Sequence, residues 1–293
     1  MDRGIIPCIT GKEQIFTGVS NCNKLEGKPV TLVICGLKSE YSADSTEFNT
    51  HFQEYVNAAP DDVQKMLIIK NIVLTSSNGG DITTSDAGYG STVPVGYNAL
   101  SQVFRISGGG DCLAKQLAKF NGQKVLIFRI DDENAIYGKA SEKSDKSIVF
   151  KGYEAFIIMS ESLADGSNPY ILNLNVYYAT NYDKERKDRH AILLDNIPDG
   201  LNGVILQKGT ATLTAKVVDI CSTDDYTSMF GNEWDYSMFV DESGANPTTV
   251  TYDATTGLLT FAPAGSYKIE NAGVLSTGNI IGIEGVNKYV PLS

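Results

Sequence analysis

Only two histidines, His51 and His190, occur among the 293 residues, and they limit the acid–base chemistry that the sequence offers. A serine or cysteine nucleophile of the triad type needs a histidine base. No Gly-x-Ser-x-Gly elbow accompanies either histidine. Zinc is also disfavoured, because no cysteine or second histidine stands at ligand spacing. We therefore predict no catalytic residue, no metal ligand and no cofactor site, and we do not expect an enzyme.

Three glycines, Gly108 to Gly110, precede a predicted helix, where free backbone amides attract phosphate. The dinucleotide spacing is absent, however, and no Lys-Ser/Thr pair follows the glycines. Asp111 places a carboxylate where a phosphate would bind. The pattern therefore indicates a flexible turn with Asp111 as the helix N-cap.

Three acidic clusters are candidates for binding a divalent cation: Asp131-Asp132-Glu133, Asp224-Asp225 and Asp61-Asp62. Adjacent carboxylates rarely converge, and the calcium-loop pattern is missing at Asp131. We interpret the first two clusters as polar turns and the third as charges at a helix start, where the helix dipole favours them.

The basic concentration Lys184 to Arg189 is interleaved with Glu185 and Asp188, which favours a solvated surface or a subunit contact. The net charge of −11 argues against a protein that holds nucleic acid by neutralising phosphates. The same charge is compatible with a surface past which DNA moves without sticking.

The five cysteines are odd in number and dispersed, which predicts buried reduced thiols: Cys8, Cys22, Cys35, Cys112 and Cys221. No signal-peptide pattern opens the chain, and no apolar run reaches the 18 residues of a membrane span. The protein is therefore expected to fold in a cytoplasm, without a membrane partner.

The clearest local pattern lies between Ser107 and Ala140. Leu113, Leu117 and Phe120 recur at helical spacing, and Asn121-Gly122 ends the helix. An apolar strand, a polar turn and a returning strand follow: Lys124–Ile130, Asp131–Asn134 and Ala135–Lys139. The stretch is expected to be a scaffold that buries its helix against a sheet.

Other elements are predicted on the same grounds: a strand at Pro29–Leu37, a helix at Thr46–Ala58 capped by Asp44 or Ser45, and a strand at Met66–Leu74. The segment Ser76–Gly96 differs from them, because it is rich in Gly, Ser and Thr. A loop of that length is usually functional or disordered. We expect it to be an arm that orders on assembly.

A boundary near Lys208 divides the chain into residues 1–207 and 208–293. The second part shows short strands separated by turns, as in a small β-sandwich: 210–219, 234–240, 248–252, 258–262, 265–272 and 280–289. Trp234 is expected in its core. The predicted fold class is mainly β, a sandwich or barrel with one or two flanking helices plus the C-terminal sandwich.

Two segments resemble a known family. Residues 115–138, KQLAKFNGQKVLIFRIDDENAIYG, resemble the helix-then-hairpin core of tail tube (major tail) proteins of tailed bacteriophages. Residues 248–275, TTVTYDATTGLLTFAPAGSYKIENAGVL, resemble the immunoglobulin-like domains often appended to those proteins. The family is defined by fold, so the resemblance supplies no catalytic residues.

The resemblance implies a structural virion protein that assembles with itself into stacked, hexameric rings around a DNA channel. Its partners would be further copies, other phage tail proteins and passing DNA. The domain 1–207 is larger than a minimal tube domain. Other interpretations remain open: a capsid decoration, head–tail connector or tail terminator subunit, or a carbohydrate-binding protein or enzyme with an appended sandwich.

Overall fold

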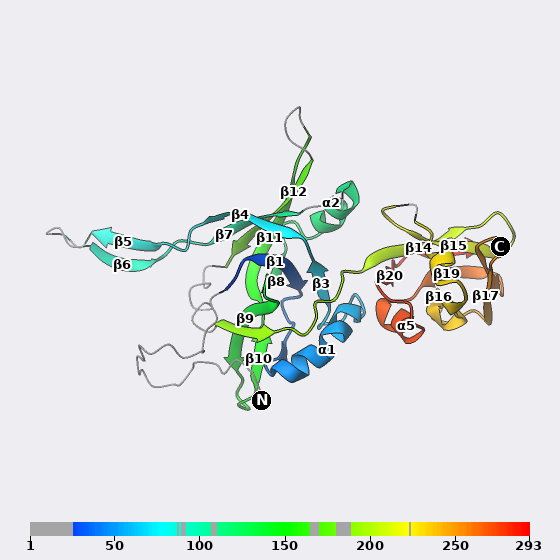
Figure 1. Cartoon of the computed structure of the whole chain (residues 1–293), viewed down its shortest axis with the longest axis horizontal. Helices are drawn as coiled ribbons and strands as arrows, with labels where there is room; N and C mark the ends of the chain where they lie inside the picture. Colours follow the sequence, from blue (N-terminus) through cyan, green and yellow to red (C-terminus); the bar gives the residue numbers. More distant parts are fainter. Residues whose placement is uncertain are drawn as a thin grey trace. The chain divides into compact units, whose positions relative to one another are not determined.

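The computed structural model describes residues 26–86, 88, 92–106, 110–164, 170–179, 189–222 and 224–293. The chain divides into two compact units (Figure 1). The first holds residues up to Phe52 together with Met66–Pro198, and the second holds Gln53–Lys65 together with Asp199–Ser293. Strands dominate both units, which confirms the predicted mainly β fold class.

The first unit is built on a curled antiparallel sheet. Its strands are β1 (Pro29–Cys35), β3 (Met66–Ile69), β4 (Ile72–Asn78), β7 (Ser101–Ile106), β8 (Lys124–Asp131), β11 (Tyr153–Ser162) and β12 (Ile171–Tyr178). Hydrogen bonding runs from β1 through β8, β11, β12 and β7 to β4. Because β3 pairs with β1 and continues into β4, the order returns to its start and the sheet forms a barrel-like ring.

The junction between β3 and β4 makes this closure possible. The sequence predicts one strand at Met66–Leu74, but Asn71 adopts φ 57° and splits it in two. Asparagine tolerates this left-handed conformation better than most residues. The chain therefore turns between pairing with β1 and pairing with β7.

Alternating residues of these strands fill the barrel, and α2 (Gly110–Ala118) packs against that core. Ala114 and Leu117 are buried in the core, while Leu113 and Phe120 pack against it from partly exposed positions. Gly122, at φ 74°, follows the helix. The predicted helix at this place and its inward face are confirmed.

The same sheet continues from β8 into β9 (Ala135–Glu142), which pairs with β10 (Ile148–Lys151) and β13 (Arg189–Leu193), and β10 pairs with β2 (Tyr41–Ser42). The helix α1 (Ser45–Asn57) follows β2 and begins in this unit. The predicted Asp44 cap of α1 is confirmed, because Asp44 Oδ1 accepts a hydrogen bond of 2.9 Å from the Glu47 amide. Phe48 on this helix packs edge-on against the rings of Tyr41 and Phe150.

The segment Ser76–Gly96 is not the loop that its composition predicts. Ser76 to Asn78 belong to β4, and most of the remainder forms a hairpin of β5 (Ile82–Asp86) and β6 (Thr92–Tyr97). This hairpin continues the β4–β7 pair outward (Figure 1), since the Gly80 amide bonds Asn98 O and the Asn98 amide bonds Asp81 O. Thr and Val pair well across a ribbon despite the surrounding glycines.

Glycine is required where this hairpin begins. Gly79 adopts φ 88°, and a Cβ at this position would lie 1.9 Å from the carbonyl oxygen of Ala99. Gly80 follows at φ 76°. The glycines that suggested flexibility therefore fix one local geometry.

The second unit contains a five-stranded sheet in the order β17 (Thr249–Asp253), β18 (Leu258–Ala262), β15 (Thr214–Asp219), β14 (Asn202–Lys208) and β20 (Ile283–Gly285). A three-stranded sheet adds β16 (Phe239–Asp241), β19 (Gly265–Ile269) and β21 (Val290–Leu292). Trp234 is buried in the core of this unit, as expected, beside Phe239.

Helical turns replace parts of two predicted strands in this unit, and a third predicted strand is shortened. Residues 234–240 contain the 3-10 turn η2 (Tyr236–Met238) before β16, and a second turn, η1 (Gly231–Glu233), precedes Trp234. Residues 265–272 end in α5 (Ala272–Thr277), which Asn271 caps. The strand predicted at 280–289 is reduced to β20. One further helix, α4 (Tyr226–Phe230), precedes η1.

The boundary between the units differs from the expected Lys208. β14 pairs with β15, so the second unit already begins at Asp199. It also includes Gln53–Lys65, where the Lys65 ammonium pairs with Glu284 at 2.6 Å and donates to Ala58 O. A contact between residues this distant in sequence leaves no signal in local composition.

The prediction of reduced cysteines is partly wrong. Cys35 is free and buried, and burial raises the pKa of its thiol to about 12. Cys112 and Cys221 are disulfide-bonded, whereas Cys8 and Cys22 lie outside the described residues. Disulfide formation depends on the approach of two Cα atoms, which an odd cysteine count does not reveal. Among the described residues, no helix has the length and apolarity needed to cross a membrane.

Candidate functional site

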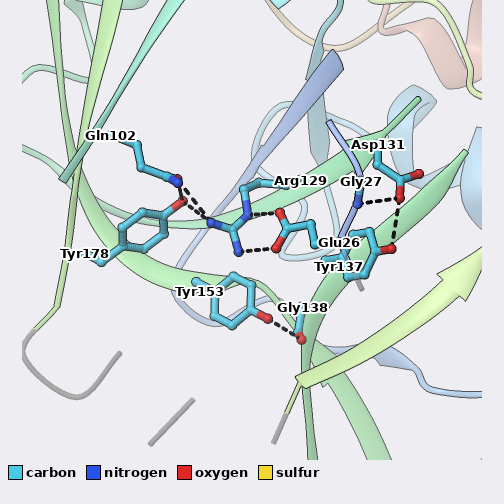
Figure 2. Close-up of polar contacts among 9 residues, drawn as sticks. All are labelled: Glu26, Gly27, Gln102, Arg129, Asp131, Tyr137, Gly138, Tyr153 and Tyr178. Carbon is cyan, nitrogen blue, oxygen red and sulfur yellow. Dashed lines mark hydrogen bonds and ion pairs between the residues drawn. The ribbon is translucent and has the colours of Figure 1, made fainter. Parts of the chain in front are cut away.

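Two charged residues of the strand β8, Arg129 and Asp131, are buried. Figure 2 shows the polar contacts that they make with side chains and backbone groups from other parts of the first unit. Buried charges require either partners or a function. Their contacts therefore decide whether this cluster is a reactive site.

The Arg129 guanidinium has polar partners on two sides. Its Nε and Nη2 face the two Glu26 carboxylate oxygens at 2.7 and 2.9 Å, which is the fork geometry of a bidentate pair. Nη1 donates to Gln102 Oε1 and to the Tyr178 hydroxyl, both at 3.1 Å. The guanidinium carbon also lies 5.1 Å from the ring centroid of Tyr153.

The Asp131 carboxylate accepts four hydrogen bonds. Oδ1 accepts from the amides of Glu133 and Ala135 at 3.0 and 2.9 Å, which closes the β8–β9 turn. Oδ2 accepts from the Gly27 amide at 3.1 Å and from the Tyr137 hydroxyl at 2.9 Å. Asp131 thereby ties the chain entering β1 to the β8–β9 hairpin.

These bonds govern how the cluster ionises. Burial alone would raise the pKa of Asp131, but the hydrogen bonds from Ala135, Tyr137, Gly27 and Glu133 outweigh it and lower that pKa. Burial and the bond to Asp131 raise the pKa of Tyr137 above its ordinary value. Asp131 is therefore charged and Tyr137 neutral near neutral pH.

The Asp131 carboxylate has no lone pair left with which to bind a substrate or a metal ion. A carboxylate offers about four lone-pair positions, and all four are filled at Asp131. Asp131 is fully buried and Arg129 is 3% exposed, so a substrate or metal would have to displace existing bonds. The arrangement holds the segment Glu26–Lys28 in place and is structural.

The sequence-predicted residues are dispersed. His51 lies on α1, and His190 is a buried residue of β13. His190 Nε2 is 3.2 Å from Ala43 O and its ring packs edge-on to Phe150. Burial lowers the pKa of His190. Within the described part of the chain, no three His, Cys, Asp or Glu side chains are grouped to hold a metal ion.

The acidic clusters have local structural partners. Asp225 caps α4 through the amides of Thr227 and Ser228, and it pairs with Lys216 at 2.9 Å. Asp62 accepts from the Gln64 amide in a turn, and no helix begins at Asp61 as was predicted. The predicted polar turn at Asp131–Glu133 is partly wrong, because Asp131 is the buried last residue of β8 and only Asp132 and Glu133 are exposed.

Two of the sequence candidates lie mainly outside the described residues. Of the glycines Gly108–Gly110, only Gly110 is described, and it is the first residue of α2, so the helix begins before Asp111. Of the basic segment Lys184–Arg189, only Arg189 is described, as the first residue of β13.

The exposed surface offers a different kind of site, the β5–β6 hairpin. Every residue of both strands is exposed. Four of them are large and apolar, with exposed fractions between 48% and 62%: Ile82, Val93, Val95 and Tyr97. Ile82 and Tyr97 are direct cross-strand partners, so their side chains share one face. Exposed apolar residues on a projecting ribbon are typical of a binding element.

Neither the buried Arg129–Asp131 cluster nor the exposed β5–β6 hairpin was predicted from the sequence, although a pattern in the sequence indicates each of them. Arg129 interrupts the apolar run of residues 124–130, and a charge inside such a run calls for a buried partner. Val93, Val95 and Tyr97 stand at alternate positions within the Gly-rich segment, which is the period of a strand.

No protein-family model matches the chain, and no curated protein sequence matches it significantly.

Proposed function

We propose that this protein is a tail tube subunit of a tailed bacteriophage, a structural virion protein that assembles into stacked rings around the DNA channel. One observation carries the proposal. A barrel-like β unit extends a hairpin whose apolar residues Ile82, Val93, Val95 and Tyr97 are all exposed. Such a ribbon cannot be stabilised by the barrel that carries it, so a neighbouring subunit is its natural partner.

The rest of the first unit supports this assignment. The buried Asp131 carboxylate accepts four hydrogen bonds within the chain and has no lone pair left for a ligand. The helix-then-hairpin segment at 115–138 folds as α2, β8 and β9, the arrangement expected of such a subunit. The net charge of −11 suits a protein that DNA passes without adhering.

The second unit would be the appended immunoglobulin-like domain. Its two sheets and its buried core around Trp234, Phe239 and Phe261 support a self-contained β domain. A domain with its own core can decorate an assembly without contributing to the barrel.

Electron microscopy of the purified full-length chain tests the proposal. We expect negatively stained preparations to contain rings or tubes with a central channel. A variant lacking Asp81–Tyr97 keeps Gly79, Gly80 and Asn98 to connect β4 to β7. It should fold and remain monomeric in size-exclusion chromatography.

A matched control separates loss of the hairpin from general damage. Ile148 is an exposed apolar residue of β10, away from the hairpin strands, and Ile148→Ser should assemble like the unaltered protein. A chain that stays monomeric at high concentration would refute the tail tube assignment. Assembly that survives the deletion would refute the role of the hairpin.

A further inference from the structure

The outer face of the barrel carries a second exposed apolar group. Phe156 and Ile158 on β11 and Tyr177 on β12 are each 41–45% exposed, and they are called the outer patch below. Phe156 and Tyr177 are direct cross-strand partners, and Ile158 occupies the next outward position of β11. Their neighbours Ala155, Ile157 and Val176 point into the core. The outer patch is therefore a continuous feature of one sheet face.

The hairpin of the same chain leaves this patch uncovered. β5 and β6 prolong β4 and β7 beyond Asn78 and Ser101, whereas β12 pairs alongside β7 within the barrel. The patch and the hairpin are both exposed in one chain. Two apolar surfaces that cannot meet within one copy can meet between copies, and such a head-to-tail contact propagates.

Charges around the two surfaces are complementary. The only charged residues between Gly79 and Leu100 are acidic, Asp81 and Asp86. On the barrel face, Lys124 stands beside Phe156, with its ammonium 6.0 Å from the ring centroid, and Arg105 lies two strands from β11, on β7. Lys124 is also paired with Glu154, so Arg105 is the positive charge of this face on which the complementarity rests.

We infer that the outer patch Phe156, Ile158 and Tyr177 is the receiving surface for the β5–β6 hairpin of a second copy of this chain. The hairpin places the cross-strand pair Ile82 and Tyr97 on the patch, and Asp86, which lies on the same face of β5 as Ile82, approaches Arg105. This inference rests on the proposed assembly function and names the partner surface of the hairpin.

Photo-crosslinking tests the contact directly. A benzoylphenylalanine placed at Val95 is irradiated in the full-length protein, assembled from a mixture of ¹⁴N- and ¹⁵N-labelled chains. We expect mixed light–heavy crosslinks to peptides that contain β11 or β12. Crosslinks between copies at any other surface overturn the inference, and the absence of crosslinks between copies overturns it together with the assembly role.

The same experiment separates this inference from the proposed function. Crosslinks to β11 or β12 without rings or tubes would support the contact and contradict the tail tube assignment. Rings or tubes whose crosslinks map elsewhere would leave the assignment standing and overturn the contact.

A complementation test supplies a second readout. Phe156→Ser combined with Tyr177→Ser removes the patch but keeps the hairpin, and the hairpin deletion keeps the patch. Each variant alone should be monomeric, with association weakened about tenfold or more. Their mixture should form a one-to-one complex in analytical ultracentrifugation and grow no further. Ile148→Ser is the matched control, and unfolding curves verify that each variant folds. Continued growth of the patch variant alone would overturn the inference.

Discussion

The interior of the barrel and its hairpin use polar and apolar residues in opposite ways. Inside, Arg129 is buried against Glu26 and Gln102, and Asp131 accepts hydrogen bonds from neighbouring amides and from the Tyr137 hydroxyl. Outside, the hairpin exposes the cross-strand pair Ile82 and Tyr97. The buried charges are bonded within one chain, whereas the exposed pair would be covered only in the proposed assembly.

This contrast indicates where function lies. Polar groups that are fully satisfied stabilise a fold and leave nothing for a ligand. Apolar groups that remain exposed on an ordered ribbon retain hydrophobic free energy for association. Substitutions of the buried polar residues should therefore affect folding, and changes in the hairpin should affect assembly.

The largest effect on folding is expected at Arg129. Replacing it with methionine, Arg129→Met, leaves the Glu26 carboxylate without its bidentate partner and should lower the free energy of unfolding by about 3–5 kcal/mol. Urea denaturation measures this change. Arg105→Met on the outer face is the matched control and should change stability by about 1 kcal/mol or less. Equal effects at the two positions would contradict the structural role of the network.

Asp131→Asn should cost about 2–3 kcal/mol near neutral pH, because an amide has one acceptor oxygen where the carboxylate has two. The pKa of Asp131 is lowered in the folded state, so its stabilisation is present above the unfolded pKa of about 4 and is lost as pH falls through the folded pKa. The difference in the free energy of unfolding between the unaltered and Asp131→Asn proteins should therefore decrease in acid. Urea denaturation at several pH values measures this difference. A difference that does not change with pH would contradict the stabilising role of ionised Asp131.

His190 should make a smaller contribution to the pH dependence of stability, at higher pH than Asp131 does. Burial lowers its pKa, so the unfolded chain binds the proton first as pH falls below about 6.5, and stability declines. His190→Gln should flatten the stability profile between about pH 7 and pH 5. His51→Gln on α1 is the control. If the free energy of unfolding changes equally with pH in the unaltered and His190→Gln proteins, His190 is not the source of the pH dependence in this range.

The smallest effect on folding is expected from deleting Asp81–Tyr97. Every strand residue removed is exposed, so the free energy of unfolding of the monomer should change by about 1 kcal/mol or less. Measurement at a concentration where the unaltered chain is also monomeric avoids a contribution from assembly. If the free energy of unfolding fell by several kcal/mol, the hairpin would belong to the barrel's own core. This result would contradict the distinction drawn between the interior and the hairpin.

Local sequence patterns predicted much of the fold. The helical spacing of Leu113 and Leu117 and the cap at Asp44 depend on near neighbours, and both predictions are confirmed. The hairpin was harder, because glycine-rich composition conceals the alternation of Val93, Val95 and Tyr97. Glycine signals flexibility in isolation, yet Gly79 and Gly80 provide the backbone conformation with which an ordered ribbon begins.

The sequence by itself determined the mainly β class, the helix before β8 and the hairpin after it, since periodicity and turn residues act over a few positions. Only the tertiary structure decided which distant groups meet. Arg129 and Glu26, for example, are 103 residues apart in the sequence and are bonded in the folded chain. Contacts between distant residues depend on strand register and barrel closure, and these are properties of the whole chain.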